Sequence, residues 1–205
     1  MTSLSPDCRA RIWLGGWGED RLLGRCTFPI GPRNTISNLA YPLVGVGLVA
    51  FDPSAAAHVF ALLLILLGIG SALYHGCKTE WTDQLDHAGM YAVFAGLTTY
   101  ALAPTSPLTA WAMVLAAAAM VIVFGFVMNL DTDPQMGVLT AAGIIHGALI
   151  GSWRRTLGAV LLLAVAYVVW HLDRRPAPPT GLWGHAVWHA MTAVGIGLLF
   201  LAQTP

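Results

Sequence analysis

Apolar segments of membrane-spanning length recur along the whole chain, and no other feature constrains its fold as strongly. A transmembrane α-helix needs about 20 consecutive apolar residues. The breaks between segments carry turn residues, as in Asp52-Pro53-Ser54 and Pro104-Thr105-Ser106-Pro107. The sequence therefore predicts an all-α membrane protein with seven transmembrane helices in one bundle. We place the segments near residues 35–51, 55–76, 84–104, 107–128, 136–151, 155–172 and 183–202.

The composition supports the same class. Only 10% of the 205 residues are charged and 57% are hydrophobic, whereas a soluble domain carries roughly 25% charged residues. The formal net charge is zero and no basic run is present, so we expect no nucleic-acid partner. Residues 1–33 contain five arginines and no continuous apolar core, which predicts a polar N-terminal segment rather than a cleavable signal peptide. Residues 34–205 then form the transmembrane domain.

The distribution of basic residues predicts the orientation. The side of the membrane that holds the N-terminus also receives the loops after the second, fourth and sixth segments. That side carries most of the basic residues, and the opposite side carries only Arg154 and Arg155. Because cytoplasmic loops are enriched in lysine and arginine, we expect a cytoplasmic N-terminal segment. The residues on the cytoplasmic side are Arg9, Arg11, Arg21, Arg25, Arg33, Lys78, Arg174 and Arg175.

Polar residues gather at one expected depth of the bundle. Ser71 and His75 lie four residues apart near the end of the second segment, and His185 and His189 lie four apart at the start of the last. Residues separated by four positions share one face of a helix. Asp86 lies in the first turns of the third segment. Since successive segments alternate in direction, all five residues fall near the cytoplasmic face.

Three imidazoles and an open position for water are typical of a catalytic zinc site. Each ionisable group inside a bilayer costs about 2.5–3.5 kcal/mol on insertion scales, and a metal compensates such a cluster. We therefore predict that His75, His185 and His189 bind zinc. Asp86 is interpreted as the general base for the zinc-bound water, or else as a fourth ligand or an acceptor that orients a histidine. Ser71 donates to that water or to an oxyanion, or else bonds its own backbone carbonyl.

Other polar residues near the segments receive structural interpretations. His87 points about 100° away from Asp86 on the helix and is expected to pack nearby. Glu19 and Asp20 are expected to be solvated charges beside arginines, and Trp17 is expected to anchor at the membrane interface. The other histidines are interpreted as packed or interfacial residues: His58, His146 and His171.

The five site residues resemble a superfamily of seven-helix membrane hydrolases. It includes the alkaline ceramidases, the progestin and adiponectin receptors with their bacterial haemolysin III relatives, and GPI-lipid remodelling proteins. The shared signature is Ser-x3-His, then an Asp in the next helix, then a C-terminal His-x3-His. In this chain the signature corresponds to Ser71, His75, Asp86, His185 and His189, and the resemblance covers most of the sequence.

Short stretches relate the chain to particular branches of that superfamily. Asn34-Thr35-Ile36-Ser37-Asn38 and Gly68-Ile69-Gly70-Ser71 are more similar to ceramidases, whereas Leu73-Tyr74-His75 and Leu85-Asp86-His87 are more similar to haemolysin III. We expect Asn34 to cap the first helix and Asn38 to hydrogen-bond between helices. The ceramidase resemblance implies zinc on the three histidines.

Calcium is not favoured as a second cofactor. Animal alkaline ceramidases hold calcium on acids around a Trp-x-Glu element, which Trp17-Gly18-Glu19 resembles. In this chain Gly16 and Arg21 stand where the family would supply oxygen ligands.

The resemblance implies a zinc-dependent intramembrane amide hydrolase with a membrane lipid as substrate, either ceramide or another N-acyl lipid. Two alternatives stay open. One is a protein like haemolysin III or the adiponectin receptors, in which zinc is structural, and the other is a lipid ester or GPI-type hydrolase. The short loops and small size imply a bacterial relative, a multi-pass protein of the inner membrane with its active site towards the cytoplasm.

Overall fold

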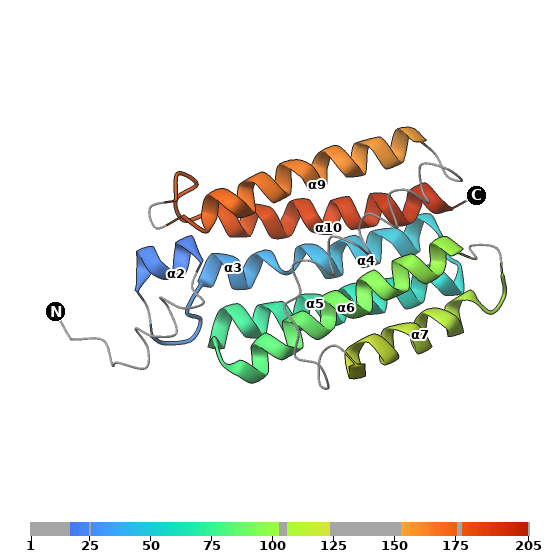
Figure 1. The fold of residues 1–205 in the computed structure, drawn as a ribbon, viewed down its shortest axis with the longest axis horizontal. Coiled ribbons are helices and arrows are strands. Elements are labelled where there is room, and N and C mark those ends of the chain that lie inside the picture. The colour runs from blue at the N-terminus through green and yellow to red at the C-terminus, as the bar shows by residue number, and fades with distance from the viewer. Residues whose placement is uncertain (1–16, 25, 103–105, 124–152, 176–177, 205) are drawn as a thin grey trace.

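Every regular element in the described part of the chain is a helix. In this computed structural model the described residues are 17–24, 26–102, 106–123, 153–175 and 178–204. The helices, numbered as in Figure 1, are α2 (Gly18–Leu23), α3 (Pro32–Ser37), α4 (Ala40–Phe51), α5 (Ala55–Cys77), α6 (Glu80–Leu102), α7 (Thr109–Met120), α9 (Trp153–Asp173) and α10 (Gly184–Gln203).

Four helical stretches of the described residues are long and apolar enough to cross a membrane. They are Pro32–Phe51, Ala55–Cys77, Trp153–Asp173 and Gly184–Gln203. Helix α6 has the length, but its acidic first turns lower its hydropathy, and the apolar stretch at Thr109–Val123 is shorter. The predicted span at 136–151 lies outside the described residues. The predicted all-helical class is confirmed for the described residues, and the four candidate spans are compatible with a membrane protein. The number of seven spans and the cytoplasmic N-terminus stay predictions.

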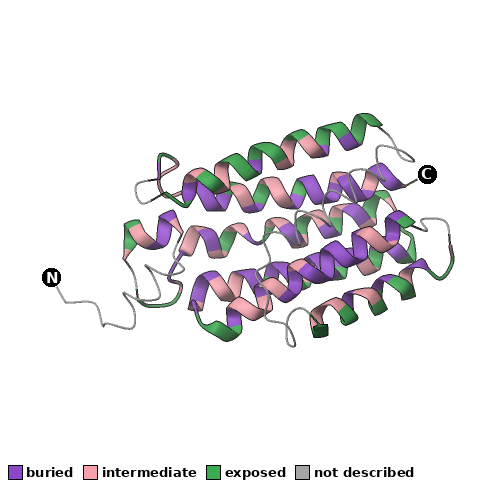
Figure 2. Cartoon of the chain, viewed as in Figure 1, coloured by how far each residue is buried: buried purple, intermediate pink, exposed green. Residues whose placement is uncertain are grey.

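The long helices lie side by side along the long axis of the molecule (Figure 1). Helix α9 packs on α10, α7 packs on α6, and α5 contacts both α4 and α6. Buried residues concentrate on α5, α6 and α10, and the outer faces of α7 and α9 are exposed (Figure 2). In the core, the Phe60 ring stacks on Phe200 at 4.7 Å and Tyr100 stacks on Phe200 at 4.3 Å between centroids. This core joins α5, α6 and α10, the three helices that carry the predicted site residues.

Close packing of α5 on α6 sets the register between Ser71 and Asp86. A Cβ atom added to Gly70 would lie 2.7 Å from the backbone carbonyl oxygen of Leu85. Gly89 lies equally close to α5, since an added Cβ would lie 2.8 Å from the Cα of Leu67. The two helix backbones therefore approach at positions where neither carries a side chain, and Ser71 and Asp86 are adjacent to the first of these contacts.

The first predicted segment forms two helices rather than one. Helix α3 ends at Ser37, and α4 begins at Ala40. Pro42 has no N–H group, so the carbonyl of Asn38 lacks the partner that a continuous helix would supply four residues later. Gly68 of α5 packs against this break, because a Cβ there would lie 2.8 Å from the Pro42 ring and 3.0 Å from the Asn38 carbonyl oxygen. Consequently α3 is a short helix, separated from α4 by the turn at residues 38–39, at the end of the bundle that carries the histidines.

The helix contact at Gly70 predicts a sharp effect of a small substitution. Gly70→Ala should destabilise the folded protein by about 1–3 kcal/mol. The new methyl group would overlap the backbone carbonyl of Leu85, which cannot move aside as a flexible side chain could. Gly47→Ala in α4 is the matched control, since an added Cβ there meets nothing within 4 Å. Denaturant unfolding of the detergent-solubilised protein measures both, and equal stability of the two variants would contradict the described packing.

Candidate metal centre

Three histidines from two helices converge at one end of the bundle. His75 lies in the last turn of α5, and His185 and His189 lie in the first two turns of α10. All three are buried, with 1%, 2% and 0% of their surface exposed. One ring nitrogen of each lies within 4.8 Å of the others, and they form the group in the described residues that is placed to hold a metal ion. We call these three residues the histidine triad.

The ring nitrogens of the triad fit a metal. The Nε2 atoms of His75 and His185 are 3.2 Å apart, close to the distance of about 3.3 Å between two imidazole nitrogens on a tetrahedral zinc. The Nε2 of His189 is buried without a hydrogen-bond partner. A buried acceptor without a partner is costly, and a metal among the three Nε2 atoms would satisfy it. A buried three-histidine site of this kind can hold a metal ion.

Stacking orients the His185 ring. The indole of Trp17 lies 3.8 Å from its centroid at an interplanar angle of 17°, and Trp188 lies 4.9 Å away on a nearly parallel plane. Trp17, expected as a membrane-interface anchor, therefore has a second role that was not predicted, because its ring covers a triad histidine. No local sequence pattern relates Trp17 to residue 185, which explains why this contact was not predicted.

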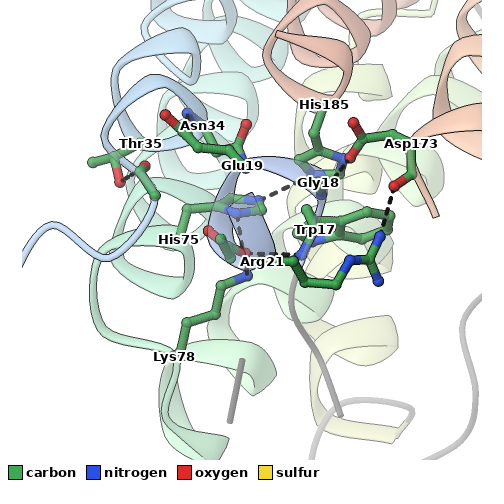
Figure 3. Close-up of polar contacts among 12 residues, drawn as sticks. Trp17, Gly18, Glu19, Arg21, Asn34, Thr35, His75, Lys78, Asp173 and His185 are labelled. Carbon is green, nitrogen blue, oxygen red and sulfur yellow. Dashed lines mark hydrogen bonds and ion pairs between the residues drawn. The ribbon is translucent and has the colours of Figure 1, made fainter. Parts of the chain in front are cut away.

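The other two triad residues have polar neighbours. Ser37 Oγ lies 2.7 Å from Nδ1 of His189. Lys78 Nζ lies 3.4 Å from Nδ1 of His75 (Figure 3). Lys78 follows α5 in a left-handed conformation with φ of 52°, which turns its side chain back under the helix end. Sequence analysis placed neither Ser37 nor Lys78 near the triad.

Asp86 and Ser71 form a pair beside the triad. Ser71 is 3% exposed and Asp86 is 9% exposed, and the Ser71 hydroxyl hydrogen-bonds to the Asp86 carboxylate. The partner of Ser71 is thus the acid of the next helix. Asp86 does not belong to the metal-ligand group that the triad forms. It contacts α5 through Ser71, which lies four residues before His75 on that helix.

Glu19 and Asp20 are buried at the same end of the bundle, so the expectation that they are solvated is wrong. Glu19 is 1% exposed and its carboxylate accepts the backbone N–H groups of Arg33 at 3.0 Å and Asn34 at 2.9 Å. Asp20 is fully buried and pairs with Lys78 at 3.0 Å. Burial raises the pKa of the Glu19 carboxyl, and burial lowers the pKa of the Lys78 ammonium while Asp20 opposes that shift.

Asp173, at the end of α9, ties α2 to the rest of the bundle. Its carboxylate accepts the backbone N–H of Gly18 at 3.0 Å and the hydroxyl of Thr180 at 3.0 Å. Arg21 donates to the carbonyl of Asp173 (Figure 3). It also donates to the carbonyl of Arg175. Helix α2 therefore packs over the triad. The carboxylates that the resemblance relates to calcium instead hold backbone N–H groups and Lys78.

The remaining histidines of the described residues lie apart from the triad. His87 lies 3.5 Å from the carboxylate of Asp83 on the partly exposed face of α6. His58 is exposed and contacts the carbonyl of Ser54 at the far end of α5. His171 is exposed near the end of α9. His146 lies outside the described residues.

No protein-family model matches this chain, and no curated protein is significantly similar to it. The functional assignment therefore depends on the chemistry of the triad and its neighbours.

The ion pair of Asp20 and Lys78 predicts strong coupling between α2 and α5. Lys78→Met or Asp20→Asn alone should destabilise the protein by about 3–5 kcal/mol, because each leaves a buried polar group without its partner. The double variant should lose clearly less than the sum of the two. A double-mutant cycle by denaturant unfolding measures this coupling.

Asp83→Asn, in the partly exposed pair with His87, is the control and should change stability by less than about 1 kcal/mol. Additive effects of the Asp20 and Lys78 substitutions would contradict a direct interaction between these side chains.

Proposed function

We propose that this protein is a zinc-dependent intramembrane amide hydrolase that acts on ceramide-like N-acyl lipids. One observation carries the proposal: the buried histidine triad lies beside a buried carboxylate–hydroxyl pair inside an apolar helical bundle. Structural zinc sites usually have four protein ligands, whereas catalytic sites keep three and an open position. Among the described residues, the group placed to hold a metal consists of three histidines and includes no carboxylate, which matches the second arrangement.

His75, His185 and His189 would hold the zinc through their Nε2 atoms. When bound, zinc supplies Lewis acidity and lowers the pKa of a bound water molecule to about 7. Asp86 would accept the proton that water releases as it attacks the acyl carbon, and would return this proton to the leaving amine. An amine leaves an acyl group only after protonation, so a buried carboxyl in this place suits amide cleavage. Ser71 would orient Asp86 by donating its single hydroxyl hydrogen to the carboxylate, and could turn that hydrogen to the carbonyl oxygen once Asp86 is protonated.

The surroundings of the site support a lipid substrate. The triad lies on helices long and apolar enough to span a membrane, and the exposed faces of α9 carry apolar side chains such as Leu161, Val165 and Val168. An N-acyl lipid keeps its amide at the boundary between chain and headgroup, the depth expected for residues in terminal helix turns. The excess of basic residues on the N-terminal side supports an active site towards the cytoplasm, and we propose a bacterial inner-membrane location.

A second candidate is a protein like haemolysin III or the adiponectin receptors, in which the metal braces the helices. The nearly complete burial of all three imidazoles, with Trp17 stacked on His185, favours this candidate. A lipid ester or GPI-type hydrolase would use the same residues on another scissile bond. Turnover and its dependence on Asp86 separate these functions.

The test is release of fatty acid from a lipid panel by zinc-loaded protein in mixed micelles, followed by mass spectrometry. The panel contains ceramides, other N-acyl lipids, lipid esters and GPI lipids. We expect cleavage of an N-acyl amide, and a fall of about 10²–10⁴-fold in Asp86→Asn, the range for losing a general acid–base group. His185→Ala and chelation of the metal should abolish turnover.

His58→Ala is the control, since this exposed histidine lies on the same helix as His75 but at the opposite end. Full activity of both Asp86→Asn and His185→Ala would reject the hydrolase. Loss of thermal stability on chelation, with no turnover of any lipid beforehand, would support the structural metal instead.

A further inference from the structure

Ser37, the last residue of α3, connects the triad to the N-terminal part of the chain. Its Oγ lies 2.7 Å from Nδ1 of His189, which is 152 positions away in the sequence. The same hydroxyl donates to the backbone carbonyl of Asn34 at 2.9 Å. A serine hydroxyl has one hydrogen and two acceptor lone pairs, so these two contacts determine where the protons lie.

Because the Asn34 carbonyl oxygen can only accept, it takes the single hydrogen of the Ser37 hydroxyl. The oxygen of Ser37 must then accept from His189, which places the ring proton on Nδ1. The Asn34 carbonyl also faces the His189 ring and is again an acceptor only. A neutral imidazole carries one N–H, so Nε2 keeps a free lone pair. This is the atom that is buried without a partner. His189 offers one ring nitrogen within 4.8 Å of those of His75 and His185, and Nε2 is the one that Ser37 leaves free.

The position of Ser37 is itself fixed by its surroundings. The backbone N–H of Asn34 donates to the buried carboxylate of Glu19 at 2.9 Å. The Asn34 carbonyl also accepts the Nδ2 group of Asn38 at 2.8 Å, a bond within α3 and its C-cap rather than the expected bond between helices. The break before Pro42 ends α3 at this point, so the Ser37 side chain faces α10. A continuous set of contacts therefore runs from Glu19 through the Asn34 backbone and Ser37 to His189.

We propose that Ser37 is a positioning residue that selects the Nδ1–H tautomer of His189 and so presents its Nε2 to the metal. Hydrogen-bond partners behind metal-binding histidines fix the tautomer and raise the basicity of the ligand, and their loss typically weakens metal binding 10–100-fold. His75 and His185 lack an equivalent acceptor in the described residues, since Lys78 faces Nδ1 of the former and Nδ1 of the latter has no partner. Ser37 is thus the tautomer-setting group of this site.

The test compares zinc affinity in three variants, using competition with a chelator of known affinity. Ser37→Ala should bind zinc 10–100-fold more weakly, and Ser37→Thr, which keeps a hydroxyl, should restore affinity to within a few-fold of the parent. Thr35→Ala is the matched control, because Thr35 lies on the same helix and its hydroxyl donates at 2.7 Å to its own backbone at Gly31. Thr35→Ala should leave zinc affinity unchanged. Equal affinity of Ser37→Ala and the parent, or equal weakening in Ser37→Ala and Thr35→Ala, would overturn the proposal.

A second measurement does not depend on any variant folding. Nitrogen-15 NMR of histidine-labelled, metal-free parent protein reports which ring nitrogen carries the proton. We expect protonated Nδ1 and unprotonated Nε2 for His189, and the opposite tautomer would overturn the proposal. The proposal depends on metal binding by the triad and not on hydrolysis. Neither readout uses a substrate, so failure of the proposed activity would leave both results interpretable.

Discussion

The cost of burying polar groups in an apolar bundle governs the construction of one end of this molecule. Buried donors and acceptors require partners, and most of those at this end have them: Glu19 holds backbone N–H groups, Asp20 holds Lys78, and Asp173 holds Gly18. The facing Nε2 atoms of the triad are different. They point at one another, and that of His189 has no partner at all. A metal ion is the partner that satisfies all three at once.

Helix α2 links the elements around the triad. Its short sequence contacts α3 through Glu19, the end of α5 through Asp20 and the end of α9 through Gly18, while the preceding Trp17 covers a triad ring. Trp17 and α2 are therefore part of the site rather than solvated residues. Since Trp17 and α2 cover the triad at this end of the bundle, a substrate that enters laterally between the helices fits the proposed lipid hydrolysis better than one that enters from that end.

Local sequence patterns predicted most of the helices and the triad itself. The lengths of the apolar segments predicted the bounds of α5, α9 and α10 to within a few residues. The four-residue spacing of His185 and His189 predicted that they share one helix face. Both predictions depend only on helix geometry. Several side-chain environments could not be predicted because the partner lies in another element. Trp17 stacks on His185 and Asp20 pairs with Lys78, both far along the chain. Glu19 accepts the backbone N–H groups of Arg33 and Asn34, only 14 and 15 positions away, but its burial depends on how α2 packs on α3, which no local pattern encodes. The contact of Ser37 with His189, 152 positions away, could not be predicted for the same reason.

The central claim is that the three imidazoles share one metal ion, and X-ray absorption spectroscopy at the zinc edge tests it most directly. Purified protein loaded with one equivalent of zinc should show three imidazole nitrogens and one further light atom at about 2.0–2.1 Å, with the multiple scattering of histidine rings. His189→Ala should lose one imidazole from that shell. A zinc-replete protein that retains no stoichiometric metal, or whose zinc lacks imidazole ligands, would contradict the account.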